Sequence, residues 1–230
     1  MTDDVFDQLA AEVLRGEVAA GEALPSERRL AEVLGVSRPS VREALKRLSH
    51  AGLVDVRQGD PTTVRDFRHS AGLDVLPQLL MSGGSLNAAV ARSVIETRLH
   101  VGPFVAELAA LRAGAELASA LAAALEELTA QTDPIGRQRA ALAFWDVVVD
   151  GADSIALRLM YNGLRAAYEP VIGVLAVVMD AEVSDHDAYR RLTAAITGGR
   201  PSVAAKAAAA LLRPATDNLF ALLEKIEESS

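Results

Sequence analysis

Cysteine is absent from the 230-residue chain, and aromatic residues make up only 4% of it. Without cysteine there can be no disulfide bond, no cysteine-ligated zinc and no thiol nucleophile, a pattern typical of a reducing compartment. Hydrophobic residues make up 50% of the chain and charged residues 23%, which is ordinary for a globular protein. The composition therefore excludes a disulfide-stapled mini-protein and a disordered chain.

Long apolar runs and a basic leader are also missing. Residues 1–7 (MTDDVFD) are acidic and do not fit a signal peptide, so we expect a cytoplasmic protein with no membrane partner. The longest apolar stretch, residues 171–179 (VIGVLAVVM), is far shorter than the roughly 20 residues that a membrane span needs. We expect this stretch to form a buried helix.

Motifs of catalysis are scarce as well. The sequence has no glycine-rich phosphate loop, no paired-carboxylate motif and no Ser/His/Asp arrangement in a recognisable context. We therefore expect that the protein is not an enzyme. A module that only dimerises stays open as an alternative for the Ala/Leu-rich part of the chain.

Charge is distributed unevenly along the chain, whose net charge is −8. Residues 25–68 carry nine Lys and Arg against six Asp and Glu, whereas residues 71–230 carry 13 against 19. An acidic protein can thus hold a basic module that binds nucleic acid. The composition changes at the same place, so we expect two domains, residues 1–69 and residues 70–230.

Helix signals and turn signals alternate in the first part. After an apolar-periodic helix that ends near Gly16, Ser26 is a candidate N-cap of a short helix that Gly35 terminates. Ser37 is a candidate N-cap of the next helix, which Gly52 ends, and residues 53–64 have the pattern of a β-hairpin. This order predicts a helix-turn-helix followed by a wing.

The second part shows the 3.6-residue period of helices almost throughout. Glycine and proline breaks, among them Gly83-Gly84 and Gly102-Pro103, divide it into six or seven predicted helices, with Asp133-Pro134 and Arg200-Pro201 as helix starts. The expected fold class is mainly α, an N-terminal winged helix-turn-helix plus a C-terminal all-α helical bundle domain.

The stretch SRPSVREALKR at residues 37–47 places Ser37, Arg38, Ser40 and Arg42 at the start of the second helix of the helix-turn-helix. Side chains at that point reach base edges and phosphates in the major groove. Arginine can bond guanine bidentately, and serine hydroxyls suit phosphates. The alternative is an ordinary solvated amphipathic helix with surface arginines.

Four motifs in this region, LPSERRLA at 24–31, LGVSR at 34–38, VREAL at 41–45 and GLV at 52–54, resemble the winged helix-turn-helix of GntR-family bacterial transcription regulators. The resemblance implies a homodimer that binds a palindromic double-stranded DNA operator. It further implies DNA contacts from three arginines, two serines and the wing tip: Arg28, Arg38, Arg42, Ser37, Ser40, Gln58 and Gly59.

The wing sequence GDPT at 59–62 is similar to the Gly-x-Pro-Thr wing of the fatty-acid-responsive FadR subfamily, although Asp60 would repel phosphate. Motifs at 96–98 (ETR), 161–165 (YNGLR) and 189–194 (YRRLTA) are similar to the FadR-type ligand-binding domain. This resemblance implies a regulator of fatty acid or lipid metabolism genes whose effector is a long-chain fatty acyl-CoA. A small carboxylate effector stays open.

Many relatives of that domain bind a metal through one Asp and three His. Alignment by that pattern puts Ala141, Trp145, Tyr189 and Leu211 at the four ligand positions, and none of them supplies the oxygen or imidazole ligand that the pattern requires. His186 lies about three residues out of register. We therefore expect no metal and no cofactor.

Without a fixed cation, an apolar tunnel becomes the natural effector site. Arg98 lies on an otherwise apolar helix and needs an anionic partner, either a ligand or a structural Asp or Glu. Aromatic residues are candidate tunnel walls, Phe104 among them, with ordinary core packing as the alternative. The candidate ligand-binding residues are Arg98, Phe144, Trp145, Tyr161, Asn162, Tyr168, Tyr189, Thr216 and Phe220.

Overall fold

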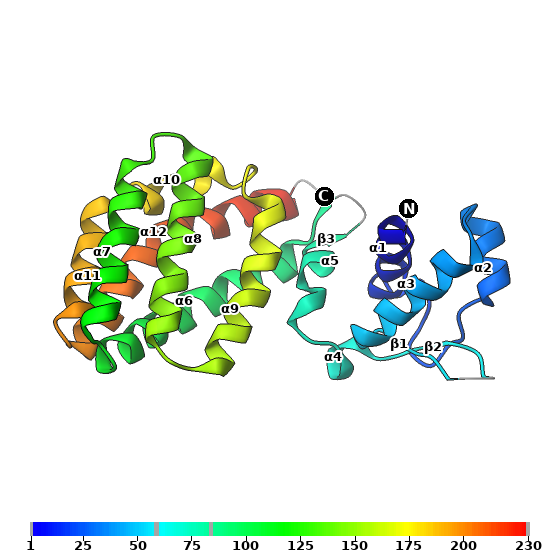
Figure 1. The fold of residues 1–230 in the computed structure, drawn as a ribbon. Coiled ribbons are helices and arrows are strands. Elements are labelled where there is room, and N and C mark those ends of the chain that lie inside the picture. The colour runs from blue at the N-terminus through cyan, green and yellow to red at the C-terminus, as the bar shows by residue number, and fades with distance from the viewer. Residues whose placement is uncertain (1, 58–59, 83–84, 229–230) are drawn as a thin grey trace. The chain divides into compact units, whose positions relative to one another are not determined.

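The computed structural model describes residues 2–57, 60–82 and 85–228. The chain is mainly helical, as expected, and divides into two compact units, residues 1–87 and 88–230, which Figure 1 shows in the colours of the chain. The sequence placed the boundary between residues 69 and 70. It falls later because Val75 and Leu79 pack into the hydrophobic core of the first unit.

The first unit contains three longer helices and several short elements. They are α1 (Thr2–Leu14), α2 (Glu27–Leu34), α3 (Arg38–His50), β1 (Val54–Asp55), β2 (Thr63–Val64), α4 (Phe67–Ser70), the 3-10 helix η1 (Leu73–Val75), α5 (Leu76–Leu80), β3 (Met81–Ser82) and β4 (Ser85–Leu86). β1 and β2 pair antiparallel, with Val54 opposite Val64. This pair forms the base of the predicted wing.

Local sequence signals set the boundaries of α2 and α3. The Ser26 hydroxyl oxygen accepts a hydrogen bond from the Arg29 backbone N–H at 3.3 Å, and Ser37 does the same for Ser40 at 3.3 Å. Gly35 ends α2 with a φ of 66°, a left-handed conformation that favours glycine. Both N-caps and the tight turn predicted from sequence are confirmed.

The second unit consists of seven α-helices and one 3-10 helix within the described residues. They are α6 (Ala88–Leu111), α7 (Ala115–Ala130), α8 (Pro134–Gly151), α9 (Ile155–Tyr168), η2 (Glu169–Val171), α10 (Ala176–Val183), α11 (His186–Thr197) and α12 (Pro201–Glu228). The predicted helix starts at Pro134 and Pro201 are confirmed. None of the helices is long and apolar enough to cross a membrane, among the residues described.

The break at Gly83-Gly84 falls between two helices, α5 and α6, as predicted, although β3 and β4 form an antiparallel pair that was not predicted, with Met81 opposite Leu86. Two local predictions were wrong. Gly102-Pro103 does not separate two helices, because α6 packs along α12 and continues through the proline. Residues 171–179 do not form one buried helix, since they are split between η2, a turn and α10.

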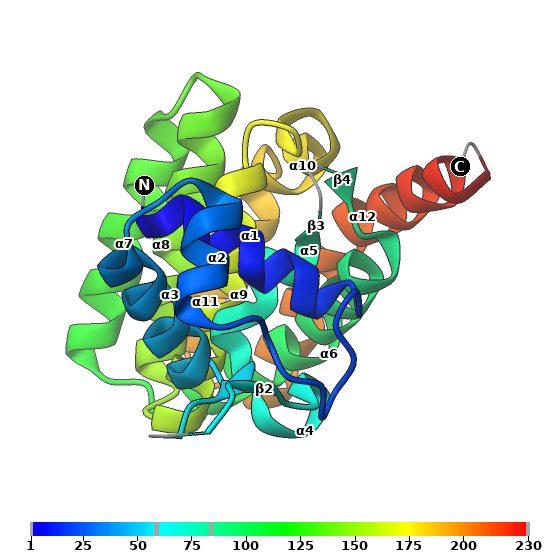
Figure 2. The ribbon, with the colours of Figure 1, turned by 90° about the vertical axis from the view of Figure 1, so that its right-hand side faces the viewer.

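The core of the second unit forms where α6, α7, α8, α11 and α12 pack together. The neighbouring pairs α6/α12 and α7/α8 can be followed in Figure 1 and from another side in Figure 2. Phe144 lies at the centre of this core, with its ring edge-on to Tyr189 at 5.0 Å and to Trp145 at 6.5 Å between ring centroids. Three of the chain's nine aromatic residues therefore meet at the centre of this core.

Candidate functional site

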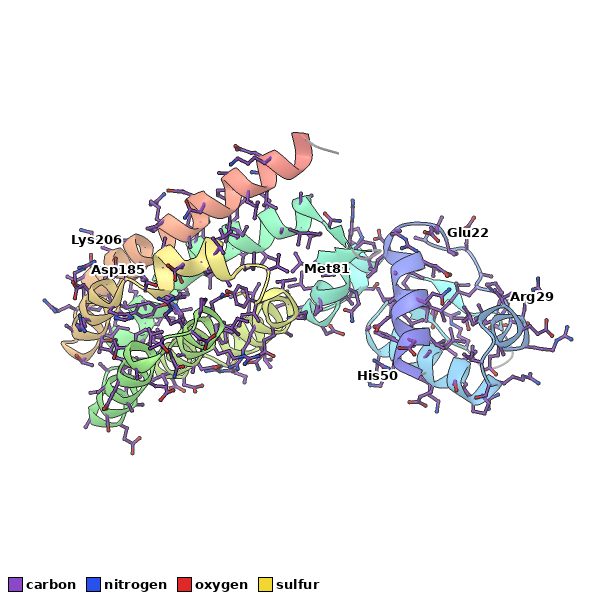
Figure 3. The ribbon with its side chains drawn as sticks, turned by 90° about the horizontal axis from the view of Figure 1, so that it is seen from above. Glu22, Arg29, His50, Met81, Asp185 and Lys206 are labelled. Carbon is purple, nitrogen blue, oxygen red and sulfur yellow. The ribbon has the colours of Figure 1, made fainter. Side chains whose placement is uncertain are left out.

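The predicted DNA-contacting arginines lie on the surface of the helix-turn-helix. The Arg28 side chain on α2 is 74% exposed, and Arg38 and Arg42 are exposed in the first turns of α3. The neighbouring Arg29 projects from α2 into solvent in Figure 3. Glu32 lies 3.7 Å from Arg28 and 3.5 Å from Arg29, so part of this positive charge is balanced within α2.

Arg42 is held by an acidic residue of the preceding helix. Its Nε and Nη2 donate hydrogen bonds to the two carboxylate oxygens of Glu27, at 3.1 and 2.8 Å. The hydrogen bond from Arg42 holds the pKa of the Glu27 carboxyl below its usual value, and the charge of Arg38 contributes. Two N–H donors of the Arg42 guanidinium are thus occupied by Glu27. Arg38 has no such clamp and is therefore the better placed of the two for a bidentate contact with a base.

Ser37 and Ser40 lie together at the N-terminus of α3. Their hydroxyl oxygens are 2.8 Å apart, and Ser37 also caps the helix. A helix N-terminus carries partial positive charge and exposed backbone N–H groups, so it suits a phosphate. Ser37 therefore has a structural role in addition to the DNA contact expected of it.

The two predicted contact residues at the wing tip, Gln58 and Gly59, lie outside the described residues. On either side, Arg57 forms an ion pair with Asp55 at 2.9 Å, and Asp60 is exposed. An exposed carboxylate beside the tip opposes close approach to phosphates.

The second unit contains a cavity of about 130 Å³ that is partly open to solvent. Its walls come from α6, α8, α9, α10 and α12, and they are almost entirely apolar. Val101 and Val105 of α6, Leu164 of α9 and Leu212 of α12 are representative wall residues. Since one enclosed water occupies at least roughly 10–15 Å³ on this measure, the space suits a ligand segment of about ten non-hydrogen atoms.

An ion pair lies at the cavity. Arg98 of α6 donates a hydrogen bond from Nη2 to the Glu182 carboxylate of α10, and both residues line the cavity. The Glu182 side chain is 2% exposed and that of Arg98 26%. Burial raises the pKa of the Glu182 carboxyl, and Arg98 opposes the rise. The sequence left two anionic partners open for Arg98, a ligand or a structural Asp or Glu. The structure shows a structural partner, Glu182.

Further polar atoms of the wall residues lack partners. Arg98 Nη1, Gln138 Nε2 and Glu182 Oε2 are buried and form no hydrogen bond within the described part of the chain. Each unpaired buried polar group costs about 1–3 kcal/mol.

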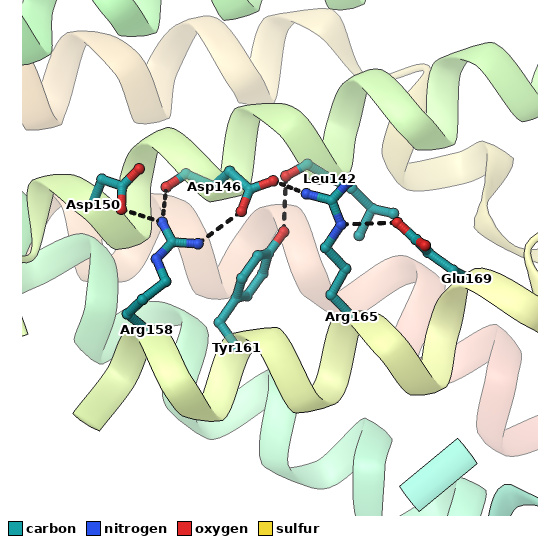
Figure 4. Close-up of polar contacts among 7 residues, drawn as sticks. All are labelled: Leu142, Asp146, Asp150, Arg158, Tyr161, Arg165 and Glu169. Carbon is teal, nitrogen blue, oxygen red and sulfur yellow. Dashed lines mark hydrogen bonds and ion pairs between the residues drawn. The ribbon is translucent and has the colours of Figure 1, made fainter. Parts of the chain in front are cut away.

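A polar network holds α9 against α8 and so closes one wall of the cavity (Figure 4). Asp146 of α8 accepts hydrogen bonds from Arg158, at 2.7 Å, and from Arg165. Tyr161 donates its hydroxyl hydrogen to the Leu142 carbonyl at 2.8 Å. Because α8 is the element that α9 contacts most apart from the adjoining η2, this network helps to fix the position of that wall.

The structure brings four of the nine predicted ligand residues to the cavity: Arg98, Trp145, Tyr161 and Tyr168.

The remaining five predicted ligand residues lie elsewhere. Phe144 and Tyr189 pack in the adjacent core, and Asn162 is exposed. Thr216 is buried and bonds the Leu212 carbonyl, and Phe220 lies under Arg92, 5.4 Å from ring centroid to guanidinium carbon. Phe104 is 51% exposed.

Sequence reasoning missed Gln138 and Glu182. Both are among the few buried polar residues, and both line the cavity. The signal for Glu182 was present, because it is a carboxylate in the apolar segment 176–183 (AVVMDAEV). The signal for Gln138 was weaker, since it lies between two arginines, Arg137 and Arg139, in the first turns of α8.

The cavity does not fit the Asp-and-His metal site expected in many related domains. Ala141 and Trp145 line the cavity, and Tyr189 and Leu211 are buried in the core around it. These side chains offer no carboxylate or imidazole ligand. Across the described ranges, no three His, Cys, Asp or Glu side chains come together in a way that could hold a metal ion.

A winged helix-turn-helix joined to an all-helical domain is the architecture of a class of bacterial transcription regulators. The chain matches the gntR family of bacterial regulatory proteins over residues 1–64 and the FCD domain over residues 93–214. It therefore belongs to the GntR family and carries an FCD domain. Residues 65–92 lie between the two matched regions.

Relatives of known class agree with this assignment. The HTH-type transcriptional regulator Mce2R of Mycobacterium tuberculosis is 58% identical over 221 residues, which cover 96% of this chain and 92% of that protein. The fatty acid metabolism regulator protein of Vibrio cholerae is 31% identical over 91 residues, 40% of this chain and 33% of that protein. These relatives are regulators, not enzymes.

Solved structures show the same fold. Lar, which controls expression of the Listeria monocytogenes agr system, matches with a TM-score of 0.63 at 17% identity and covers 96% of this chain and 97% of its own. A GntR-family regulator of Pseudomonas syringae matches with a TM-score of 0.53 at 20% identity, covering 99% and 88%. At these identities the likeness concerns the fold alone.

Proposed function

We propose that this regulator binds a palindromic operator as a homodimer and that an acyl ligand in the FCD cavity, a long-chain fatty acyl-CoA, changes its affinity for DNA. The single observation that carries the proposal is the cavity of about 130 Å³, whose walls are almost entirely apolar and include the side chains of Arg98, Gln138 and Trp145. Such a site suits an aliphatic body with one oxygen-bearing head. The protein would act in the cytoplasm, on genes of fatty acid or lipid metabolism.

Two further features support an acyl ligand of the FadR kind. The wing motif GDPT is similar to that subfamily, and a fatty acid metabolism regulator is among the relatives. The residues around the cavity also lack the ligands for a metal, which would otherwise anchor a small carboxylate. We therefore propose that the effector binds without metal or cofactor.

The size of the cavity suggests how binding could be coupled to DNA affinity. A volume of about 130 Å³ accepts only part of a long acyl chain, so the rest of the chain must extend out of the opening or displace the surrounding helices. Val94, Arg98 and Val101 of α6 line the cavity, and α6 begins at Ala88, the first residue of the second unit. A ligand regulates only if it binds the DNA-competent and DNA-incompetent states with different affinity.

The test combines DNA release with a signal from the cavity itself. A palindromic duplex selected from random DNA is followed by fluorescence anisotropy while palmitoyl-CoA is added below its micelle concentration. Trp145, the one tryptophan of the chain, lines the cavity and reports binding through its emission. We expect operator affinity to fall at least about tenfold, a coupling of about 1.4 kcal/mol, together with a change in Trp145 emission.

A pair of variants separates binding in the cavity from nonspecific effects. Ala141→Leu adds volume to the wall of the cavity and should weaken the acyl-CoA response, whereas Ala143→Leu adds the same volume on an exposed site of α8. Coenzyme A alone and small carboxylates are titrated in parallel. If only a small carboxylate releases the protein from DNA, that carboxylate replaces the acyl ligand as the proposed effector. If none of the ligands releases it, the helical domain serves dimerisation only.

A further inference from the structure

The solvent-facing side of α9 carries no charge. Its exposed residues are Ile155, Ala156, Leu159, Asn162 and Ala166. Ile155 is 74% exposed and Leu159 61%, although both side chains are large and apolar. The two arginines of the helix, Arg158 and Arg165, lie toward α8 and pair with Asp146 (Figure 4). The charges of α9 are thus satisfied within the protein, and its outer side is left uncharged, unlike that of an ordinary surface helix.

The other long helices of the second unit differ from α9 in this respect. The helices α6, α7, α8, α11 and α12 each expose at least one charged side chain, for example Glu96, Glu116, Arg139, Arg190 and Lys206 in that order. Charged residues are depleted at the centre of protein interfaces, because their burial costs desolvation energy. Among these helices, α9 therefore presents the outer surface that another helix can cover with the least desolvation of charge.

The exposed residues of α9 have the spacing of a helix-pairing seam. The seam consists of Ile155, Leu159, Asn162 and Ala166. Successive members are four, three and four positions apart, the alternation by which one helix packs along another. Its first half is large and its second half is small, so two copies in antiparallel order place large side chains against small ones. Gly163, in the middle, lets the two backbones approach closely.

Asn162 lies at the middle of this seam. The motif YNGLR predicted a ligand contact for it, but Asn162 is exposed and does not line the cavity. Its side-chain amide holds both N–H donors and a carbonyl acceptor, so two such amides that meet across a two-fold axis can bond each other. A single asparagine in a helix-pairing seam lowers stability but fixes the register and the partner. The seam is therefore complementary to a second copy of itself.

We propose that α9 is the dimerisation face of the second unit, that it packs antiparallel against α9 of a second copy, and that Asn162 sets the register. The inference rests on the proposed function, because a palindromic operator requires two copies, and it names the surface through which they join. A two-fold interface uses the same patch on both copies, which the seam satisfies. The helices cross near Asn162 and Gly163, with Leu159 opposite Ala166 of the second copy.

Disulfide cross-linking tests this register without interference, because the chain contains no cysteine. On mild oxidation, full-length Asn162→Cys should give a disulfide-linked dimer on a non-reducing gel, since both cysteines lie at the crossing. The double variant Leu159→Cys/Ala166→Cys should also cross-link. Each of its single variants should not, because equal positions lie apart in an antiparallel pair. Ser119→Cys, at an exposed position of α7, is the control and should not cross-link.

A charge placed on the seam should separate the two copies. Leu159→Glu brings two like charges into the pairing face and should raise the dissociation constant of the dimer at least about tenfold, measured by sedimentation equilibrium. Ser119→Glu adds the same charge to α7 and should leave the dissociation constant unchanged. Circular dichroism checks the fold of both variants, and the cysteine variants decide the case if Leu159→Glu does not fold.

The outcomes separate the interface from the homodimer itself. A wild-type dimer that Leu159→Glu does not weaken, or that Asn162→Cys does not cross-link, overturns α9 as the dimerisation face and leaves the proposed homodimer standing. The face would then belong to a partner other than a second copy. Single variants that cross-link as strongly as the double variant overturn the antiparallel register. A wild-type protein that is monomeric both free and on the operator overturns the proposed homodimer as well.

Discussion

At the scale of single residues, the two arginines at the start of α3 differ in what the protein leaves free. Arg42 is clamped by both carboxylate oxygens of Glu27, whereas Arg38 is exposed and contributes only its charge to Glu27. A clamped guanidinium is well positioned for one phosphate, and a free fork can bond guanine through two hydrogen bonds. We therefore assign base recognition to Arg38 and positioning to the Glu27–Arg42 pair.

Arg38→Ala should abolish specific DNA binding and leave the fold intact. Loss of a bidentate base contact costs about 1–3 kcal/mol for each recognition helix. Anisotropy on operator and on scrambled duplexes would measure this, with Arg15→Ala, beyond the helix-turn-helix at the end of α1, as the control. Unchanged discrimination between the two duplexes would refute the assignment of α3 as the recognition helix.

Glu27 should make the first unit sensitive to acid. Its pKa lies below the ordinary value of 4.5, chiefly because of the hydrogen bond from Arg42, so the folded state favours the ionised carboxylate. This stabilisation is complete above pH 4.5 and is lost as the pH falls through the lowered folded value. The free energy of unfolding, measured in urea at neutral and acidic pH, should fall less on acidification in Glu27→Gln than in the wild-type protein. An equal fall in both proteins would contradict the linkage.

At the scale of elements, α9 depends on polar contacts more than the other cavity walls do. Ile155 and Leu159 on this helix are 74% and 61% exposed, so much of its apolar surface is not buried against the core. Asp146, 26% exposed, accepts from Arg158 and Arg165 and ties both ends of the helix to α8 (Figure 4). The network therefore decides how firmly the cavity is closed.

Asp146→Asn should loosen this wall. Removal of one member of a partly buried charge network that joins two arginines should cost about 1–3 kcal/mol, less than for a fully buried pair because about a quarter of the side chain is exposed. Asp150→Asn, at 73% exposure with Arg158 as its partner, should cost under about 0.5 kcal/mol. The free energies of unfolding of the two variants are compared by urea titration followed through Trp145 emission. Equal losses of unfolding free energy in both variants would refute the anchoring role of Asp146.

At the scale of the whole molecule, the net charge of −8 opposes indiscriminate binding to DNA. The attraction must come from the local basic surface of the helix-turn-helix, where Arg28, Arg38 and Arg42 lie exposed. Such binding releases counterions from DNA and weakens steeply with salt. The acidic second unit adds no attraction of its own.

Operator affinity should therefore fall roughly 10²-fold between about 50 and about 200 mM salt, if Arg28 and Arg42 from each of two chains neutralise phosphates. Anisotropy titrations at several salt concentrations give the slope directly. Arg28→Ala should reduce the slope by about two for a dimer. A slope near zero would mean that phosphate contacts do not dominate the affinity.

Local signals were enough to predict the DNA-binding unit. Ser26, Gly35 and Ser37 act through backbone groups within a few residues of themselves, so their effects follow from neighbouring sequence. The same reasoning failed at Pro103, where packing of α6 on α12 outweighs the lost hydrogen bond, and at residues 171–179, where a turn interrupts the apolar run. Contacts between the distant segments α6 and α12 decided the first of these.

The sequence by itself determined the helix-turn-helix, the helical second domain and the family, because these depend on short-range periodicity, caps and contiguous motifs. Only the tertiary structure decided what the second domain can bind. Glu182 reaches Arg98 across 84 positions of sequence, and Gln138 and Trp145 meet them from a third helix. A cavity is a property of packed side chains, so its charge balance appears only when the helices that form it have come together.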